Sequence, residues 1–503
     1  MYSQPTIQWQ QCFGSSIGGA ASCIQQTRDG GYIVSGTVSS GGGNVTNYHG
    51  NQDCWIVKLD NTGTIQKEKC FGGSASEEAY YIQQTTDHGY IFVGVTNSHD
   101  GDATGNPFGT NPWVVKIDTN FNIEWQKSFG DSSGEVAYCI QQTSDGGYII
   151  AGSAGHKVIG NHGATDFWML KLTSTGAIQW EKCLGGSDDD DACTIRQTTD
   201  GGFIIAGLTY SNDGDVSGLH IYPFYITYDY WVVKTDSIGT IQWQRCLGGS
   251  QDDEARSIIQ TSDGGYIVAG STLSNDGDVT GLHLNSLGQQ SDDYWVVKLN
   301  GNGEIQWQKC VGGSTYDYGQ CIQQTIDGGY IVIGTAESSD GDVVGQHGNN
   351  DCWVVKLNNS GGIEWQKCIG GSSSDGGNFI QQTADSGYII VGGTGSVDGD
   401  VNCGQNRGYW VIKLSENDYI NSDCVISIFP NPSSGDFEVR YGKMIENGNF
   451  QVFDVLGQKV FEETISFSSI NEINLYKVAQ GMYIIRVYDG EKFYQKKFIV
   501  QRK

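Results

Sequence analysis

Short runs of apolar, β-branched and aromatic residues alternate with polar turns along residues 1–414. Within residues 305–357, four such runs read "IQWQKC", "QCIQQT", "YIVIGT" and "CWVVKL". Runs of this length between segments rich in Gly, Asn and Asp are typical of β-strands joined by tight turns. We therefore predict four strands here, the first of which completes the sheet of the preceding unit.

This pattern recurs seven times, each time with an Asp-x-Gly-aromatic turn between the first and second strands. All 13 Trp residues fall at two positions of the repeat, on the predicted third and fourth strands. Self-similarity at intervals of 55 to 64 residues indicates units that bury their faces only against their neighbours. We expect the tryptophans to pack between stacked sheets. The turns lie at Asp29–Tyr32, Asp87–Tyr90, Asp145–Tyr148, Asp200–Phe203, Asp263–Tyr266, Asp327–Tyr330 and Asp385–Tyr388.

The two ends of the repeat region supply incomplete units. The chain opens with a fourth-strand sequence, "IQWQQC" at 7–12, and the repeats end with a third-strand sequence, "YWVIKL" at 409–414. In a ring these strands would pair and complete the seventh sheet, whereas an open solenoid such as a parallel β-helix gives no reason for the offset. We therefore predict an all-β fold. It comprises a seven-bladed β-propeller of four-stranded blades over 1–415, closed by the N-terminal strand, a linker at 416–423, and a small Ig-like β-sandwich at 424–503.

Acidic residues outnumber basic ones, and the net charge of −28 disfavours nucleic acid and anionic membranes as partners. In a propeller, the Asp-Gly turns lie on one face, and the loops between second and third strands share the other face with the links between blades. Those links carry Glu77, Asp188–Asp191 and Asp252–Glu254, so we predict that this face is strongly acidic. With blades numbered in chain order, the loops between second and third strands are longest in blades four and five.

The loops between second and third strands carry regularly spaced acids. In blade six, Asp340, Asp342 and Asp351 stand at positions 1, 3 and 12 of a twelve-residue stretch with Gly345 at position 6, a spacing that resembles a calcium loop. Calcium is therefore a candidate ligand, although we favour the alternative that these acids cap loop amides. The first two acids recur at Asp100 and Asp102, Asp213 and Asp215, Asp276 and Asp278, and Asp398 and Asp400.

Five of the eight histidines occupy one equivalent position in these loops: His49, His162, His220, His283 and His347. A residue that recurs in this way indicates a structural role in the repeat more than catalysis. A metal held by Asp213, Asp215 and His220 is the alternative.

The loop of blade four, "LHIYPFYITYDYW", departs from the pattern because it is rich in aromatic residues. On a surface loop, Tyr222, Phe224, Tyr225 and Tyr228 could stack against a sugar or anchor a partner protein. The alternative is that they pack over the equally long loop of blade five.

Most of the fourteen cysteines also fall at repeat positions. If Leu59 faces Ile65 across the turn, Cys54 faces Cys70, and the same register places Cys352 opposite Cys368. Directly opposed strand residues can come close enough for a disulfide, so we predict two cross-strand disulfides, in blades one and six. Cys403 with Cys424 is a weaker candidate pair. No Cys-x-x-Cys motif supports zinc.

The repeats stop after residue 415, and residues 424–503 alternate strands with turn glycines. Their motifs resemble the C-terminal sorting domain of substrates of the type IX secretion system of Bacteroidota. The motifs are Pro430, Asn431, Pro432, Gly435, Gly457 within "VFDVLGQKV", Gly481 and Tyr483. The resemblance implies that the secretion machinery reads residues 424–503 after export to the periplasm and that the protein is secreted or held at the cell surface. A passive adhesive sandwich is the alternative.

Two further features bear on export. No apolar run approaches the roughly 20 residues that span a bilayer. The start, "MYSQPTIQW", lacks the apolar core of a signal peptide, so we expect that an export signal was removed or never preceded it.

These observations favour a secreted or cell-surface binding or adhesion module that engages a glycan or a protein on its acidic face. The alternative is an enzyme that degrades extracellular polysaccharide, with an acidic site over the channel mouth near blades four and five. We favour binding because the acids recur around the ring without marking one reactive blade, and we assign no catalytic residue. The sequence carries no Ser/His/Asp motif, phosphate loop or nucleotide fingerprint.

Overall fold

A computed structural model describes residues 4–14, 18–107, 109–130, 134–155, 158–221, 225–404, 408–415, 426–429, 436–454, 458–475, 478–488 and 493–501. The chain divides into two compact units: Thr6–Glu416, and Asn417–Lys503 with Met1–Pro5. Within the described ranges the chain forms strands and turns, and no helix there is long and apolar enough to cross a membrane.

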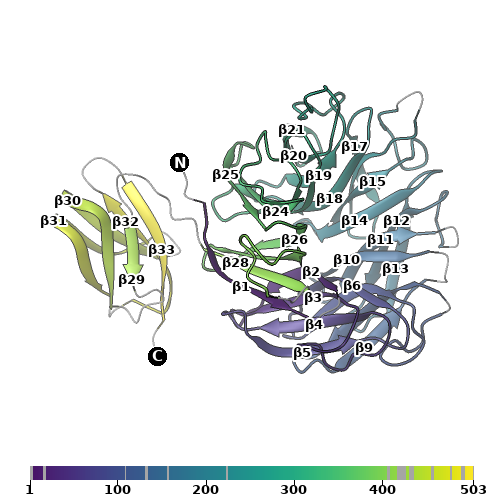
Figure 1. Ribbon diagram of the computed structural model, residues 1–503, viewed down its shortest axis with the longest axis horizontal. Coiled ribbons are helices and arrows are strands. Elements are labelled where there is room, and N and C mark those ends of the chain that lie inside the picture. The colour runs from purple at the N-terminus through teal and green to yellow at the C-terminus, as the bar shows by residue number, and fades with distance from the viewer. Residues whose placement is uncertain are drawn as a thin grey trace. The chain divides into compact units, whose positions relative to one another are not determined.

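The larger unit consists of seven four-stranded antiparallel sheets arranged around a centre (Figure 1), which confirms the seven-bladed β-propeller. The second and third strands of each blade are almost entirely buried, and the fourth strand is partly exposed at the outside of the ring. In order from first to fourth strand, the blades are β2 (Gly19–Gln26), β3 (Tyr32–Val38), β4 (Asp53–Leu59) and β5 (Ile65–Phe71); β6 (Glu77–Gln84), β7 (Tyr90–Thr96), β8 (Asn111–Ile117) and β9 (Ile123–Ser128); β10 (Val136–Gln142), β11 (Tyr148–Ala154), β12 (Asp166–Leu172) and β13 (Ile178–Leu184); β14 (Asp190–Gln197), β15 (Phe203–Thr209), β16 (Asp229–Thr235) and β17 (Ile241–Leu247); β18 (Asp253–Gln260), β19 (Tyr266–Thr272), β20 (Asp293–Leu299) and β21 (Ile305–Val311); β22 (Asp317–Gln324), β23 (Tyr330–Ala336), β24 (Asp351–Leu357) and β25 (Ile363–Ile369); and β26 (Asp375–Gln382), β27 (Tyr388–Thr394), β28 (Tyr409–Leu414) and β1 (Ile7–Phe13).

The N-terminal strand closes the ring, as the offset of the repeats predicts. Strand β1 pairs antiparallel with β28, so that Gln10 lies opposite Ile412. The backbone amide of Ala384 in blade seven donates to Gln26 Oε1 in blade one at 2.8 Å. The equivalent bond links each of the six remaining pairs of neighbouring blades, so that these bonds form a complete ring. They join Arg28 to Gln84, Thr86 to Gln142, Ser144 to Gln197, Thr199 to Gln260, Ser262 to Gln324 and Ile326 to Gln382.

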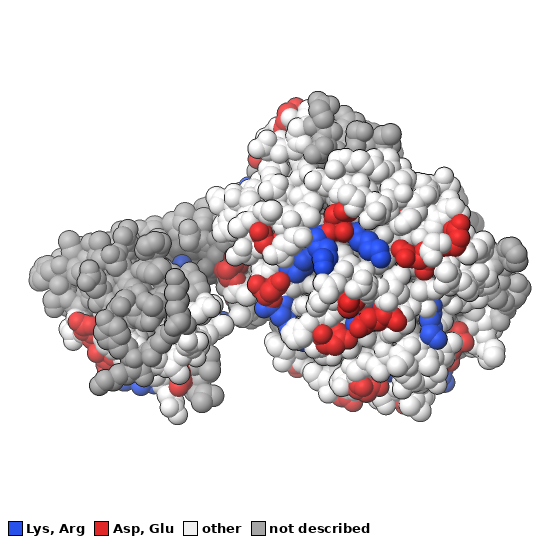
Figure 2. All heavy atoms as spheres, turned by 90° about the horizontal axis from the view of Figure 1, so that it is seen from below, with Lys and Arg blue, Asp and Glu red and all other residues white. Residues whose placement is uncertain are grey.

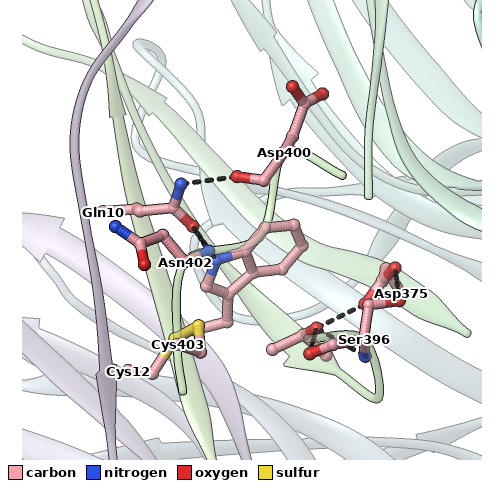
Figure 3. The surroundings of a disulfide bond; sticks show 9 residues. Gln10, Cys12, Asp375, Ser396, Asp400, Asn402 and Cys403 are labelled. Carbon is pink, nitrogen blue, oxygen red and sulfur yellow. Dashed lines mark hydrogen bonds between the residues drawn. A yellow bond between two sulfur atoms is a disulfide. The ribbon is translucent and has the colours of Figure 1, made fainter. Parts of the chain in front are cut away.

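A disulfide between Cys12 of β1 and Cys403 of the blade-seven loop reinforces this closure (Figure 3). Next to it, Gln10 Nε2 donates to the Asp400 carbonyl at 2.6 Å, and Gln10 Oε1 accepts from Trp410 Nε1 at 3.0 Å. The side chain of Gln10 therefore ties the first strand of the chain to both the loop and the third strand of the last blade. The weaker predicted pair, Cys403 with Cys424, is therefore wrong, because Cys403 is bonded to Cys12; Cys424 itself lies outside the described residues.

Tryptophans of the third strands fill the space between blades, as expected. Trp55, Trp231, Trp295 and Trp353 are fully buried, and each of them packs against an aromatic ring of the preceding blade. Trp55, for example, lies 4.7 Å from the Tyr409 ring, and the Tyr409 hydroxyl donates to the Trp55 carbonyl at 2.8 Å. Contacts of this kind combine burial of a large apolar surface with a satisfied polar group.

The predicted disulfides Cys54–Cys70 and Cys352–Cys368 are wrong, because all four cysteines are buried free thiols. The register of β4 and β5 shifts by one residue after Leu59 and Ile65, so Cys54 faces Phe71 and Cys70 faces Trp55. In blade six the same shift places Cys352 opposite Ile369 and Trp353 opposite Cys368. A one-residue shift puts the two thiols of each pair on opposite faces of the sheet.

The smaller unit contains β29 (Ile426–Phe429), β30 (Asp436–Asp454), β31 (Lys459–Asn474), β32 (Gly481–Tyr488) and β33 (Phe493–Val500). The long strand β30 pairs with β29, β31 and β32, and β33 pairs with β32. Tyr483 is buried in its core, and the Tyr483 hydroxyl donates to the Ala479 carbonyl at 2.8 Å. Of the predicted sorting motif, Gly481 begins β32, whereas Pro430, Asn431, Pro432, Gly435 and Gly457 lie outside the described residues.

Candidate ligand-binding surface

The first acid of each Asp-Gly-Asp loop caps the link that enters its own blade. Asp340 Oδ1 accepts the backbone N–H of Ser314 at 2.7 Å, and this bond lowers the pKa of Asp340. An Asp side chain that accepts a loop amide is the capping role that we favour for these residues. The equivalent bonds, all 2.7 Å, join Asp100 to Ser74, Asp213 to Ser187, Asp276 to Ser250 and Asp398 to Ser372.

The second acid of these loops lies near a histidine of the preceding blade. Asp342 Oδ2 is 3.8 Å from His283 Nε2, and His283 Nδ1 is 2.7 Å from Asp293, which begins the third strand of that blade. The hydrogen bond with Asp293 raises the pKa of His283. Three more junctions repeat this chain of contacts: Asp215 with His162 and Asp166, Asp278 with His220 and Asp229, and Asp400 with His347 and Asp351.

These contacts separate the acids that the calcium-like spacing groups together. Asp340 caps Ser314, Asp342 lies near His283, and Asp351 bonds His347, so each acid has a different partner. The alternative metal set of blade four is divided in the same way, because Asp213 bonds Ser187, Asp215 lies near His162, and His220 bonds Asp229. In blade two, the backbone amide of Asp102 donates to the Gly72 carbonyl. Within the described ranges, no three His, Cys, Asp or Glu residues are grouped so that they could hold a metal ion.

A second set of acids on this face is fully buried. Asp190, Asp253 and Asp317 begin the first strands of their blades and bond neighbouring amides and hydroxyls; Asp253, for example, accepts from Gly249 N and Ser274 Oγ at 2.8 Å. Burial raises the pKa of each to about 7. Because these carboxyls are inaccessible, they do not face a ligand.

The aromatic loop of blade four forms one wall of an open cleft of about 490 Å³, which we call the blade-four cleft. Tyr225 is 72% exposed in it, whereas Tyr228 packs on Tyr210 with ring centroids 5.0 Å apart. The cleft is lined by Ser187, Asp188, Tyr210, Asn212, Asp213, Leu219, Ile221, Tyr225, Ile226 and Thr227. Tyr222 and Phe224 lie outside the described residues.

This cleft combines the two kinds of group that a polar ligand with apolar faces requires. Ile221, Tyr225 and Ile226 present exposed apolar surface, while Asn212 and Asp188 supply hydrogen-bonding groups beside it. Sequence patterns point to the aromatic loop and, among the acids of the predicted acidic face, to Asp188, but not to Tyr210 or Asn212 at the start of the same loop. Only the fold brings these segments to one place.

A group of carboxylates from blades four and five lies at the loop ends of the first strands, where the sequence predicts the alternative acidic site. Glu254 pairs with Arg256 at 2.8 Å, and the charge of Asp191 acts on Glu254. Burial, together with the charges of Asp252 and Glu254, raises the pKa of Asp292 to about 6. A carboxyl with a raised pKa beside ionised neighbours has the electrostatics of a general acid.

The surface charge of the propeller is mixed in the one view of it that Figure 2 gives. There Lys and Arg side chains lie between Asp and Glu side chains over the blades, and no single-sign patch dominates. In addition, seven ion pairs join a nearly buried third-strand lysine to the acid of the Asp-Gly turn in the same blade. They are Lys58–Asp29, Lys116–Asp87, Lys171–Asp145, Lys234–Asp200, Lys298–Asp263, Lys356–Asp327 and Lys413–Asp385, each 2.9 to 3.0 Å long.

Residues 427–501 match the family model of the secretion system C-terminal sorting domain. The C-terminal part of the chain is therefore a sorting domain of type IX secretion, as its motifs indicate. Such a domain implies recognition by the type IX secretion machinery and export to the medium or to the outer surface of the cell.

The chain is also similar to two curated proteins. It is 24% identical over 247 residues to an endo-acting ulvan lyase of Formosa agariphila, covering 47% of this chain and 42% of that protein. It is 25% identical over 191 residues to the regulatory protein FlaEY of Caulobacter vibrioides, covering 35% of this chain and 18% of that protein. The chain thus spans less than half the length of either relative.

Among solved structures, the WD40 domain of Neurospora crassa Pan2 is similar at a TM-score of 0.44 and 12% identity. The match covers 79% of this chain and 89% of that domain.

Proposed function

We propose that the protein is an exported binding module whose propeller holds a glycan in the blade-four cleft. The observation that supports this most directly is Tyr225, which stands 72% exposed beside Asn212 and Asp188 in a cleft of about 490 Å³. That volume falls within the range of small-molecule sites. A tyrosine ring can stack on the apolar face of a sugar while amide and carboxylate groups bond its hydroxyls.

Two further observations support a glycan over a protein ligand. The cleft is concave and mixes apolar and polar groups, whereas a protein partner is usually bound by a broader surface. The similar protein of Formosa agariphila is named as an endo-acting ulvan lyase, and this chain matches 42% of its length. Calcium has no required role in this proposal.

A glycan-binding screen of the full chain tests the proposal. For any glycan that binds, Tyr225→Ala should weaken binding at least tenfold, equivalent to about 1.4 kcal/mol. Tyr316→Ala is the matched control, because Tyr316 is also partly exposed but lies outside the cleft. Absence of glycan binding, or equal affinity of the Tyr225→Ala variant and the wild type, would contradict the proposal.

A second candidate function, cleavage of an extracellular polysaccharide, is favoured by the raised pKa of Asp292 beside Asp252 and Glu254. In this case Asp292 would supply a proton to the leaving group. Asp292→Asn should then abolish product release while leaving glycan affinity intact, and wild-type turnover should fall as the pH rises through about 6, because a general acid must be protonated to act. Unchanged turnover in Asp292→Asn would exclude this role.

A further inference from the structure

The central channel of the propeller contains a cavity of about 400 Å³ that is lined by the first strands of the blades. One equivalent position of these strands contributes Gln25, Gln83, Gln141, Gln323 and Gln381, whereas blade five has Ile259 and blade four has Arg196 there. Among the described residues that line the cavity, Arg196 is the only one with a formal charge. This cavity shares no lining residue with the blade-four cleft.

The amide groups of four of these glutamines have a fixed orientation. Gln25 Oε1 accepts the backbone N–H of Gln84 at 2.6 Å, and a backbone N–H can only donate. The oxygen of each side chain is therefore occupied, and its NH₂ group is left to donate elsewhere. The same bond is made by Gln83 to Gln142 N, by Gln141 to Gln197 N and by Gln381 to Gln26 N.

Arg196 adds a positive charge to these donors. Its Nη1 donates to Cys139 Sγ at 2.9 Å and to the Ile195 carbonyl at 2.8 Å, and its Nη2 donates to the Tyr81 hydroxyl at 3.0 Å. These bonds use three of the five N–H groups of a guanidinium. No described carboxylate forms an ion pair with Arg196, although the chain as a whole has a net charge of −28.

The surroundings of Arg196 do not neutralise its charge. No Asp or Glu side chain is among the described residues that line the cavity, and burial raises the pKa of the Cys23 thiol to about 12. A guanidinium stays protonated in proteins, and a partly buried charge without a counter-ion is unfavourable. An anion that enters the cavity would both pair with Arg196 and accept from the glutamine NH₂ groups.

We propose that the channel cavity binds a small organic anion of about monosaccharide size, with its carboxylate or sulfate group against Arg196. The remaining guanidinium N–H groups match the geometry of a two-oxygen acceptor. The surrounding glutamine amides suit the hydroxyl and oxyanion oxygens of such a ligand. The cavity volume of about 400 Å³ accommodates a single sugar ring with its charged substituent.

Calorimetric titration of the full chain with sodium glucuronate, sodium sulfate and glucose tests this site. Arg196→Gln is the informative variant, because five other blades carry Gln at the equivalent position and the variant should fold. Arg245→Gln is the matched control, since Arg245 lies on the fourth strand of the same blade and bonds Gln244 and Asn302 carbonyls. Comparing the affinities for glucuronate and sulfate distinguishes a site for a sugar acid from a site for a free inorganic anion.

We expect glucuronate to bind the wild type and the Arg245→Gln variant equally, and the Arg196→Gln variant at least tenfold more weakly. Binding of sulfate but not glucuronate would overturn the monosaccharide assignment. Equal binding of glucose and glucuronate, or unchanged affinity in Arg196→Gln, would overturn the anion site. If Arg196→Gln does not fold, Arg196→Lys replaces it, because lysine retains the positive charge and should retain part of the affinity. A folded Arg196→Lys variant that binds neither anion would contradict the proposal.

Discussion

Replacing both Cys12 and Cys403 with serine should loosen the closure of the propeller while leaving each blade intact. The disulfide joins residues 391 apart in sequence, so it greatly restricts the unfolded chain. The loop-entropy relation gives a loss of about 20 cal/mol/K for a loop of this length, or roughly 6 kcal/mol at 25 °C. Measured losses are usually smaller, and we expect about 2 to 5 kcal/mol.

The assay is thermal unfolding of wild type and the Cys12→Ser/Cys403→Ser variant, each with and without dithiothreitol. For a unit of about 400 residues, a loss of 2 to 5 kcal/mol lowers Tm by about 2 to 6 °C. Reductant should lower Tm of the wild type to that of the variant and leave the variant unchanged, because the other cysteines that the structure describes are free thiols. A reductant effect of equal size in both proteins, or equal Tm without reductant, would refute the reasoning.

Three further predictions follow from the acids and the sorting domain. The pKa of Asp190, Asp253 and Asp317 is about 7 in the folded protein against 3.8 for a free side chain, so the folded protein binds protons more tightly than the unfolded chain. Tm should therefore rise as the pH falls from 8 to 5, and Asp253→Asn should flatten this dependence. Because Asp340 caps Ser314, Asp340→Asn should lower Tm equally in calcium and in chelator, whereas stabilisation of the wild type alone by calcium would support the calcium loop. Deleting residues 427–501 should keep the propeller out of the medium and off the cell surface in immunoblots of fractionated cells, and surface delivery of the truncated chain would contradict the role of this domain.

Much of the fold could be predicted from sequence because it rests on periodic, local signals. The repeated turns, the two tryptophan positions and the incomplete units at both ends together determine the number of blades and the strand that closes the ring. The predicted disulfides failed because one extra residue after Ile65 shifts the register of β4 and β5. A single bulged residue leaves no clear mark on a pattern of alternating side chains.

The candidate sites were less accessible to sequence reasoning because their residues come from different segments of the chain. Spacing groups Asp340, Asp342 and Asp351, but two of their partners, Ser314 and His283, belong to other segments. The same limit applies to the channel cavity, which exists only when the seven first strands are placed around one axis. The departure of blade four from the repeat, visible at Arg196 and in its aromatic loop, was the available signal.

Hydrogen exchange of the N-terminal strand tests the closed ring most directly, because the placement of the loops, the cleft and the channel all depend on it. The backbone amides of β1 that donate to β28 should be protected to the same degree as the amides of β28 that donate to β1, since the two sets belong to one ladder of hydrogen bonds. Complete exchange of residues 7–13 within seconds, with residues 409–414 still protected by β27, would show that β1 does not close the propeller.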